Sequence, residues 1–223
     1  MTAAVQHIEP APDRLWYAAY GSNMAAGRLG VYLAGGRPAG GLRDYPGARD
    51  RTPPVRDEPV WLPGTVYFAL ESRVWGGGMA FYDPDADGRT PARAYLMTAG
   101  QFSDLAAQEM HRVPGDDLDL VDALRSGRHR YGPGRYETLV HVGERDGWPM
   151  LTLTAPWHLV DVTLTAPSAA YLRMLAAGLR EAHGWTVEQV AEHLADLPGA
   201  RGVWTADRVA EAIGTPAGAS SAR

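Results

Sequence analysis

The sequence predicts an α+β fold. Strand-like segments come first, helical segments gather at the end, and the regular alternation of strand and helix that indicates a parallel sheet is absent. A chain of 223 residues with 45% hydrophobic residues can bury a sizeable core as one domain, or as one domain with a small appendage.

The composition excludes several kinds of chemistry. The chain has no cysteine, which excludes disulfides, thiolate metal sites and cysteine nucleophiles. All 21 basic residues are arginine, so lysine nucleophiles and a P-loop lysine are excluded as well. The net charge of −5 does not indicate a nucleic-acid or membrane partner, and no apolar run reaches the roughly 20 residues of a membrane span. We expect a cytoplasmic enzyme or binding protein.

The first half of the chain consists mainly of expected strands. Residues 1–14 lack the basic and apolar regions of a signal peptide and are expected to form a flexible leader. Residues 37–64 are rich in Gly, Pro, Arg and Asp, which predicts a long surface connection with at most one short strand. The other expected elements are strands over 15–21, 64–70, 77–83 and 91–98 and a helix over 24–34 that ends at Gly35-Gly36.

The second half contains a hairpin and further helices. Thr98 followed by Gln101 is a capping box, which predicts the start of a helix over 98–111. Asp146-Gly147 is a favourable turn dipeptide between two alternating arms. The remaining expected elements are a short helix over 117–125, the hairpin over 135–155, a helix from the N-cap Ser168 to Gly184, a helix that begins with the capping box of Thr186 and Gln189, and a short helix over 205–214.

A short polar turn, Gly21-Ser22-Asn23, joins the first strand to the first helix. Serine or asparagine at such a position commonly caps the first free amides of the helix. Those amides, at the positive end of the helix dipole, can instead hold a carboxylate or a developing oxyanion. The sequence is compatible with both an ordinary capped turn and an anion cradle.

Glu109 is the strongest candidate for a catalytic group. Together with Phe102, Leu105 and Ala106 it has the i, i+3, i+4, i+7 spacing of one helix face, so its carboxylate is expected among apolar side chains. Desolvation in such surroundings raises the pKa of a carboxyl group, which suits it to act as a general acid or base near neutral pH. The alternative is a glutamate at the edge of the apolar stripe, paired with an arginine.

Other clusters are interpreted as structural. Residues 83–88 (DPDADG) begin like a calcium loop, but Ala94 occupies the place of the bidentate glutamate, so a hairpin loop is expected. The acidic residues within 116–122 are typical of a solvated helix start, and no metal site is predicted. Tyr136 and Tyr171 can serve either as packing aromatics or as hydroxyl donors in a pocket.

Three stretches, YAAYGSNM (17–24), TAGQFSDLAAQE (98–109) and GRYETLVHV (134–142), together resemble the γ-glutamylcyclotransferase-like family. Members of that family have a strand that ends in Tyr-Gly-Ser-Asn, a glutamate near the end of a later helix, a tyrosine-containing strand and a C-terminal PS…Y helix. The ordered set is more specific than YGSN alone. Its counterparts here are Tyr20, Gly21, Ser22, Asn23, Glu109, Tyr136, Pro167, Ser168 and Tyr171.

The resemblance implies a small mixed β-barrel with surrounding helices and a pocket at the YGSN turn. It covers about residues 15–195, which we take as one domain with an insert at 112–134. Residues 196–223 then form a C-terminal extension, consisting of one helix and a disordered tail.

The resemblance also implies an activity that needs neither metal nor cofactor. A γ-glutamyl amide is converted to 5-oxoproline and a free amine or amino acid when its α-amine attacks its own γ-carbonyl, with Glu109 as general acid and base. The expected partner is this small-molecule substrate, and a homodimer is left open. The implied substrate-binding residues are Tyr20, Gly21, Ser22, Asn23, Met24, Tyr136 and Tyr171.

The sequence departs from the family pattern after Glu109. Met110 replaces the usual glycine and is expected to narrow the pocket, and the insert 112–134 is expected to cover it and select the leaving group. Two other functions stay open, a binding protein without catalysis and the cleavage of a γ-glutamyl-protected biosynthetic intermediate. The arginines of the insert, which either meet an acidic substrate or are solvated, are Arg112, Arg125, Arg128 and Arg130.

Overall fold

The computed structural model describes residues 12–38, 44–72 and 74–214. The expected disordered tail after Gly214 and most of the expected leader lie outside these ranges. Within them the chain has a mixed α+β fold with a mostly antiparallel central sheet, as predicted.

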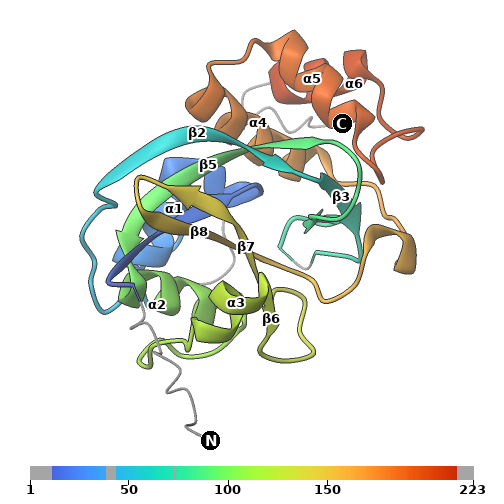
Figure 1. Cartoon of the computed structure of the whole chain (residues 1–223). Coiled ribbons are helices and arrows are strands. Elements are labelled where there is room, and N and C mark those ends of the chain that lie inside the picture. The colour runs from blue at the N-terminus through green and yellow to red at the C-terminus, as the bar shows by residue number, and fades with distance from the viewer. Residues whose placement is uncertain (1–11, 39–43, 73, 215–223) are drawn as a thin grey trace, which may run out of the picture.

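A six-stranded sheet in the order β2-β5-β1-β8-β7-β6 forms the centre of the fold (Figure 1). Neighbouring strands are antiparallel except for β1 and β8, which run parallel. A separate two-stranded sheet consists of β3 and β4. The strands are β1 (Arg14–Ala19), β2 (Arg56–Pro63), β3 (Thr65–Ala69), β4 (Met79–Asp83), β5 (Arg89–Thr98), β6 (Arg128–Arg130), β7 (Thr138–Arg145) and β8 (Trp148–Thr154).

The strand pairings of the described residues do not close the sheet into a barrel. Strands β2 and β6 form the two edges of the six-stranded sheet, and no strand joins them. Single bridges from Ala69 to Leu164 and from Gly77 to Pro167 connect the β3–β4 hairpin to the segment before Ser168. The barrel that the family resemblance implies is therefore not confirmed.

The segment 37–64 contains a longer strand than the sequence predicts. Strand β2 pairs with β5 over its whole length, yet only Val60 and Leu62 of its residues are buried. Pro59 and Pro63 lie within it. An edge strand tolerates proline and polar side chains because one side of its backbone makes no ladder hydrogen bonds. Its composition therefore gives little sign of a strand.

Strand β1 lies in the middle of the sheet and is buried on both faces. Leu15, Trp16 and Ala18 are completely buried and Tyr17 is nearly so. Burial on both faces explains why apolar residues follow one another here without polar alternation. The polar turn that follows β1 therefore extends from a rigid central strand.

The helix boundaries largely follow the predicted caps. Thr98 and Gln101 form the predicted capping box, and so do Thr186 and Gln189. The hydroxyl of Ser168 accepts a hydrogen bond from the amide of Tyr171. The α-helices are α1 (Ala26–Ala34), α2 (Ala99–Glu109), α3 (Val121–Ser126), α4 (Ala169–His183), α5 (Val187–Asp196) and α6 (Ala206–Gly214), with 3₁₀ turns η1 (Ser22–Met24) and η2 (Leu159–Asp161).

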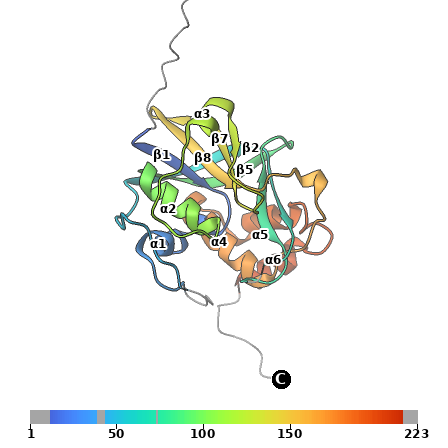
Figure 2. The same ribbon diagram turned by 90° about the horizontal axis from the view of Figure 1, so that it is seen from below.

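The helices lie in separate groups around the sheet. Helices α4, α5 and α6 pack against one another, and Val209 of α6 is completely buried among them. Figures 1 and 2 show this group apart from α2 and α3. In the described part of the chain, no helix has both the length and the apolar character that crossing a membrane requires.

The hairpin of β7 and β8 turns at Asp146-Gly147, as predicted. Both residues have positive φ, 51° and 78° respectively. Positive φ at both central positions is typical of a type I′ turn, which matches the twist of the two strands and favours glycine at the second position.

His193 on α5 makes the stability of the fold sensitive to acid. The pKa of His193 is lowered to about 4, mainly by burial, with a smaller lowering by His183 and an opposing effect of Asp196. Above pH 6.5 the imidazole is neutral in both the folded and the unfolded chain. As the pH falls from 6.5 towards 4, the unfolded chain binds a proton that the folded chain resists, so stability falls.

We expect the wild type to lose about 2 kcal/mol more than His193→Gln when the pH is lowered from 7 to 5. Urea denaturation of both proteins at the two pH values measures the difference. The same pH dependence in both proteins would contradict the assignment to His193.

Candidate active site

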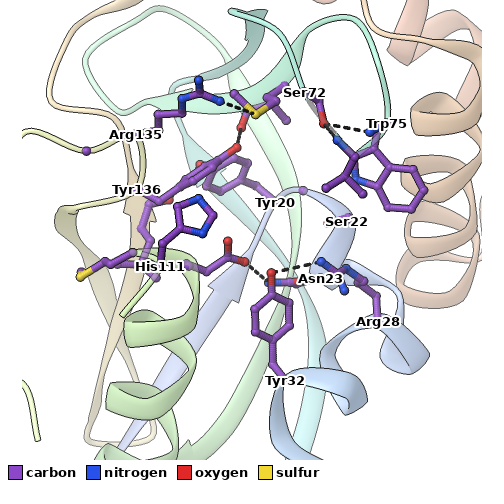
Figure 3. A pocket seen from close by; sticks show the side chains of 18 of the residues that line it. Tyr20, Ser22, Asn23, Arg28, Tyr32, Ser72, Trp75, His111, Arg135 and Tyr136 are labelled. Atoms are coloured by element: carbon purple, nitrogen blue, oxygen red, sulfur yellow. Dashed lines mark hydrogen bonds between the residues drawn. The ribbon is translucent and has the colours of Figure 1, made fainter. Parts of the chain in front are cut away.

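A cavity of about 750 Å³ lies where the turn after β1 meets the end of α2 (Figure 3). Its size is typical of small-molecule sites, and its wall is largely aromatic. The residues around it come from the turn (Tyr20, Gly21, Ser22, Asn23), from α1 (Arg28, Tyr32), from the end of α2 (Glu109, Met110, His111), from the region of β4 (Ser72, Trp75, Met79, Ala80), from the segment before β7 (Gly134, Arg135, Tyr136, Glu137) and from α4 (Tyr171).

The turn after β1 is not a side-chain cap, contrary to one of the two sequence interpretations. Neither Ser22 nor Asn23 caps η1 or α1. The amide of Ala26, the first residue of α1, instead donates to Oε2 of Glu181 at 2.9 Å. The carboxylate of a distant helix thus occupies the position that a local polar side chain was expected to fill.

Met24 does not line the cavity. Its side chain is 2% exposed and packs into the core against Gly178 of α4. A 3₁₀ turn points successive side chains in different directions, so Asn23 faces α2 while Met24 faces α4. The implied role of Met24 in substrate binding is therefore not supported by its position.

Asn23 and Glu109, 86 residues apart in the chain, meet at the cavity. The amide nitrogen Nδ2 of Asn23 donates to Oε1 of Glu109 at 3.0 Å and to the hydroxyl oxygen of Tyr17 at 3.2 Å. Asn23 is buried, Glu109 is half-buried, and none of the ion pairs among the described residues includes Glu109. The carboxylate therefore has an uncharged amide as its partner and is not paired with arginine.

Helix α2 is buried on more sides than its apolar stripe predicts. Every residue from Gln101 to Gln108 is buried, including Asp104. Asp104 is held by Arg49, whose Nε lies 3.0 Å from Oδ1 of Asp104. A buried carboxylate is tolerated in the core when it has a charged partner. The hydrophobic periodicity of the helix does not predict such a partner.

The charge of Glu109 acts on four tyrosine hydroxyls that line the cavity. Burial raises the pKa of Tyr17, Tyr32, Tyr136 and Tyr171 above the usual 10, and the negative charge of Glu109 raises each further. The Tyr32 hydroxyl also accepts a hydrogen bond from Nη2 of Arg28 at 3.2 Å. These hydroxyls remain protonated at neutral pH, so the described tyrosines add no negative charge to the cavity.

Tyr20, Tyr136 and Tyr171 all line the cavity, with their hydroxyls bound to backbone groups. Tyr20 donates to the carbonyl of Leu153 and Tyr136 to the carbonyl of Ala80, each at 2.8 Å. The hydroxyl oxygen of Tyr171 accepts from the amide of Ala80 at 3.4 Å. The sequence left packing and pocket lining as alternatives, and the structure shows both at once.

Several lining residues lie outside the predicted set, among them Arg28, Tyr32, Tyr45, Trp75 and Arg135. Arg28 and Tyr32 are four residues apart on α1, so they share a helix face directly after the polar turn. That spacing was a usable signal. Trp75 stacks on Tyr171 with ring centroids 5.9 Å apart, a contact that only the folded chain brings about.

The insert 112–134 contributes little to the cavity wall. Gly134 is its one residue among the described lining residues, although the preceding Met110 also lines the cavity. None of the four arginines of the insert lines it. Arg112 pairs with Glu137 at 2.8 Å, and Arg128 donates to the carbonyl of Ala155. Of the two interpretations of these arginines, contact with an acidic substrate inside the cavity is not supported by their positions.

A cluster of Asp83, Asp85 and His158 is the one group among the described residues that could hold a metal ion. It does not line the cavity. Asp83 already accepts hydrogen bonds from the amides of Asp85 and Leu159. The expected hairpin loop at 83–88 connects β4 to β5, which belong to different sheets, so it is not a hairpin.

Asn23→Ala removes the donor shared by Glu109 and Tyr17. We expect a loss of about 1–3 kcal/mol in the free energy of unfolding, because a buried acceptor is left without its partner. Urea denaturation measures it. Tyr17→Phe, which keeps the bond from Asn23 to Glu109, should cost less, and equal stability of Asn23→Ala and the wild type would contradict the expectation.

Comparison with known proteins gives a likeness at the level of fold. No protein-family model matches the sequence. A curated Arabidopsis thaliana protein, histone deacetylase 5, is 32% identical over 200 residues, which cover 81% of this chain. The chain spans only 30% of the length of that protein.

Solved structures resemble most of the chain. The crystal structure of the uncharacterized human protein loc79017 (Homo sapiens) has a TM-score of 0.50 and 16% identity, and covers 92% of this chain and 100% of its own. A structure of a gamma-glutamyl cyclotransferase has a TM-score of 0.48 and 16% identity over 90% and 98% of the two chains. YkqA from Bacillus subtilis has a TM-score of 0.46 and 17% identity over 84% and 56%. The chain has the mixed α+β fold of the human protein loc79017.

Proposed function

We propose that this chain is a γ-glutamylcyclotransferase-like enzyme that converts a γ-glutamyl amide to 5-oxoproline and a free amine. The observation that carries the proposal is the 3.0 Å hydrogen bond between Asn23 and Glu109 at the wall of a 750 Å³ cavity. It joins the polar turn and the candidate base, which the sequence motifs associate, in one site.

The proposed reaction is an intramolecular acyl transfer. Glu109 takes a proton from the substrate's α-ammonium group, and the freed amine attacks the γ-carbonyl carbon and closes a five-membered ring. The bond from that carbon to the leaving nitrogen breaks as Glu109 returns the proton to this nitrogen, and the ring nitrogen passes its remaining surplus proton to the released amine, which leaves as an ammonium ion. No water, metal or cofactor is consumed, and the site mainly has to fold the substrate into a reactive conformer.

The amides of the turn are suited to the developing oxyanion. The first hydrogen bond of η1 runs from the amide of Met24 to the carbonyl of Gly21. The amides of Ser22 and Asn23 precede it, so they have no acceptor within the turn. Both residues line the cavity. We assign these two amides to the γ-carbonyl oxygen as it becomes negatively charged.

A matched pair of substrates tests the reaction. Wild-type protein is incubated with a panel of γ-glutamyl amides and with the corresponding glutaryl amides, which lack the α-amine but are otherwise identical. Products are measured by mass spectrometry. We expect 5-oxoproline and free amine from γ-glutamyl amides and no cleavage of glutaryl amides, because ring closure requires the α-amine.

The other outcomes distinguish the remaining functions. Cleavage of both series would indicate a hydrolase. Tight binding of 5-oxoproline without release of amine would indicate a binding protein. An acetylated lysine peptide is included because the Arabidopsis relative is named a histone deacetylase. Release of acetate from it, without 5-oxoproline from any γ-glutamyl amide, would contradict the proposal.

A further inference from the structure

Arg28 is a buried cation at the wall of the cavity. Arg28 is 7% exposed and lies on α1, one turn before Tyr32 (Figure 3). Its Nη2 donates to the hydroxyl of Tyr45 at 2.7 Å and to that of Tyr32 at 3.2 Å. Its Cζ lies 4.7 and 4.8 Å from the ring centroids of Tyr45 and Tyr32. The guanidinium group is thus held in one place by two tyrosines.

The guanidinium group has unused donors. Nε and Nη1 of Arg28 are buried, and neither has a hydrogen-bond partner among the described residues. No carboxylate in the described ranges forms an ion pair with Arg28, whereas the other largely buried arginine, Arg93, is paired with Asp57 and Glu181. Leaving a buried charge unpaired is costly, so such a group is normally paired with an anion.

Arg28 keeps its positive charge despite this burial. Burial lowers the pKa of Arg28, but the neighbouring Tyr32 and Tyr45 hydroxyls and the Glu109 carboxylate outweigh this effect and raise it above its usual value. The cavity therefore contains a fixed positive charge beside the proposed base.

We propose that Arg28 forms an anion subsite in the cavity and attracts a carboxylate group of the ligand through its positive charge. Both parallel N–H pairs of a guanidinium group include Nη2, which here donates to Tyr32 and Tyr45, so the attraction is that of the charge and does not need a bidentate fork. This inference rests on the proposed function, where the group is the α-carboxylate of the γ-glutamyl substrate and of 5-oxoproline.

The subsite also explains how the α-amine reaches Glu109. Tyr32 accepts a hydrogen bond from Arg28, and the charges of Arg28 and Glu109 both act on its hydroxyl, so the cation and the carboxylate lie near the same group. In an α-amino acid the ammonium and carboxylate groups are attached to the same carbon. A carboxylate held by Arg28 therefore directs the ammonium group towards Glu109.

Two matched probe pairs test the subsite. 5-Oxoproline and 2-pyrrolidinone have the same ring and differ in the carboxylate, and a γ-glutamyl amide differs from the corresponding 4-aminobutanamide in the same way. Calorimetric titration measures the binding of the products, and mass spectrometry measures kcat/KM for the substrates. We expect the wild type to prefer each carboxylate-bearing probe by about tenfold to a hundredfold.

Variants assign this preference to one arginine. Arg28→Met is expected to abolish it, and Arg28→Lys, which keeps the charge without the fork, to retain part of it. Arg135→Met tests the alternative that Arg135, which also lines the cavity, is the arginine that binds the carboxylate. Loss of the preference in Arg135→Met but not in Arg28→Met would overturn the proposal.

If Arg28→Met does not fold, the wild-type measurements alone still test whether the cavity has a subsite for a carboxylate. Equal affinity for 5-oxoproline and 2-pyrrolidinone, or no binding of either, would overturn the subsite. Failure of the proposed function has a different signature, since a carboxylate preference that depends on Arg28 without any release of 5-oxoproline would support the subsite and contradict the cyclotransferase.

Discussion

Replacing Glu109 by glutamine is expected to slow the release of 5-oxoproline by about 10²–10⁴-fold, the range that general acid–base catalysis contributes. The amide of glutamine cannot take the proton from the α-ammonium group. Its oxygen can still accept the hydrogen bond that Nδ2 of Asn23 now donates to Oε1. The variant should therefore fold and bind 5-oxoproline, and initial rates measured by mass spectrometry isolate the chemical step.

Glu144→Gln is the matched control. Glu144 lies exposed on β7 and does not line the cavity, so the same change of charge there should leave the rate unaltered. A folded Glu109→Gln that retains more than about a tenth of the wild-type rate would contradict the role of Glu109 as the general acid and base.

Gly178→Ala is expected to destabilise the protein by about 1–3 kcal/mol, the usual range for overpacking a core. Gly178 lies where α4 crosses η1, and a Cβ atom there would approach Cβ of Met24 to 2.5 Å and the amide nitrogen of Ala25 to 2.9 Å. The backbone of one element has to move. Because η1 carries Asn23, we also expect a raised KM for the substrate, measured alongside urea denaturation.

Gly30→Ala is the matched control for this prediction. Gly30 also lies within a helix, but a Cβ atom at that position has nothing within 4 Å. Alanine is favoured over glycine in a helix by about 1 kcal/mol, so this variant should be slightly more stable than the wild type. If Gly178→Ala were equally stable, the close contact between α4 and η1 would not be the reason for glycine at position 178.

Local signals predicted the elements whose causes are local. Capping residues such as Thr98 and Thr186 mark the starts of helices because their hydroxyls bind amides only three residues away. Asp146-Gly147 marks a hairpin because the turn itself requires positive φ. Strand β2 went largely unrecognised because its stability comes from pairing with β5, which is distant in sequence.

The predicted cap at Ser22-Asn23 was wrong for a similar reason. A side chain from the same turn was expected to bind the first amide of α1, but the partner is Glu181, 155 residues away from Ala26. Because Glu181 of α4 binds the first amide of α1, the side-chain amide of Asn23 is free to donate a hydrogen bond to Glu109. The sequence identified both residues as notable, but it could not pair them.

The sequence by itself determined the α+β class, the starts of the two helices that open with capping boxes, the restricted chemistry of a chain without cysteine or lysine, and the two segments that carry the candidate site. Only the tertiary structure decided which groups meet in the cavity. It brought Asn23 to Glu109, lined their cavity with tyrosines, and buried Arg28 at its wall without a carboxylate partner among the described residues. Periodicity and capping act over a few residues, whereas these contacts depend on how whole elements pack against one another.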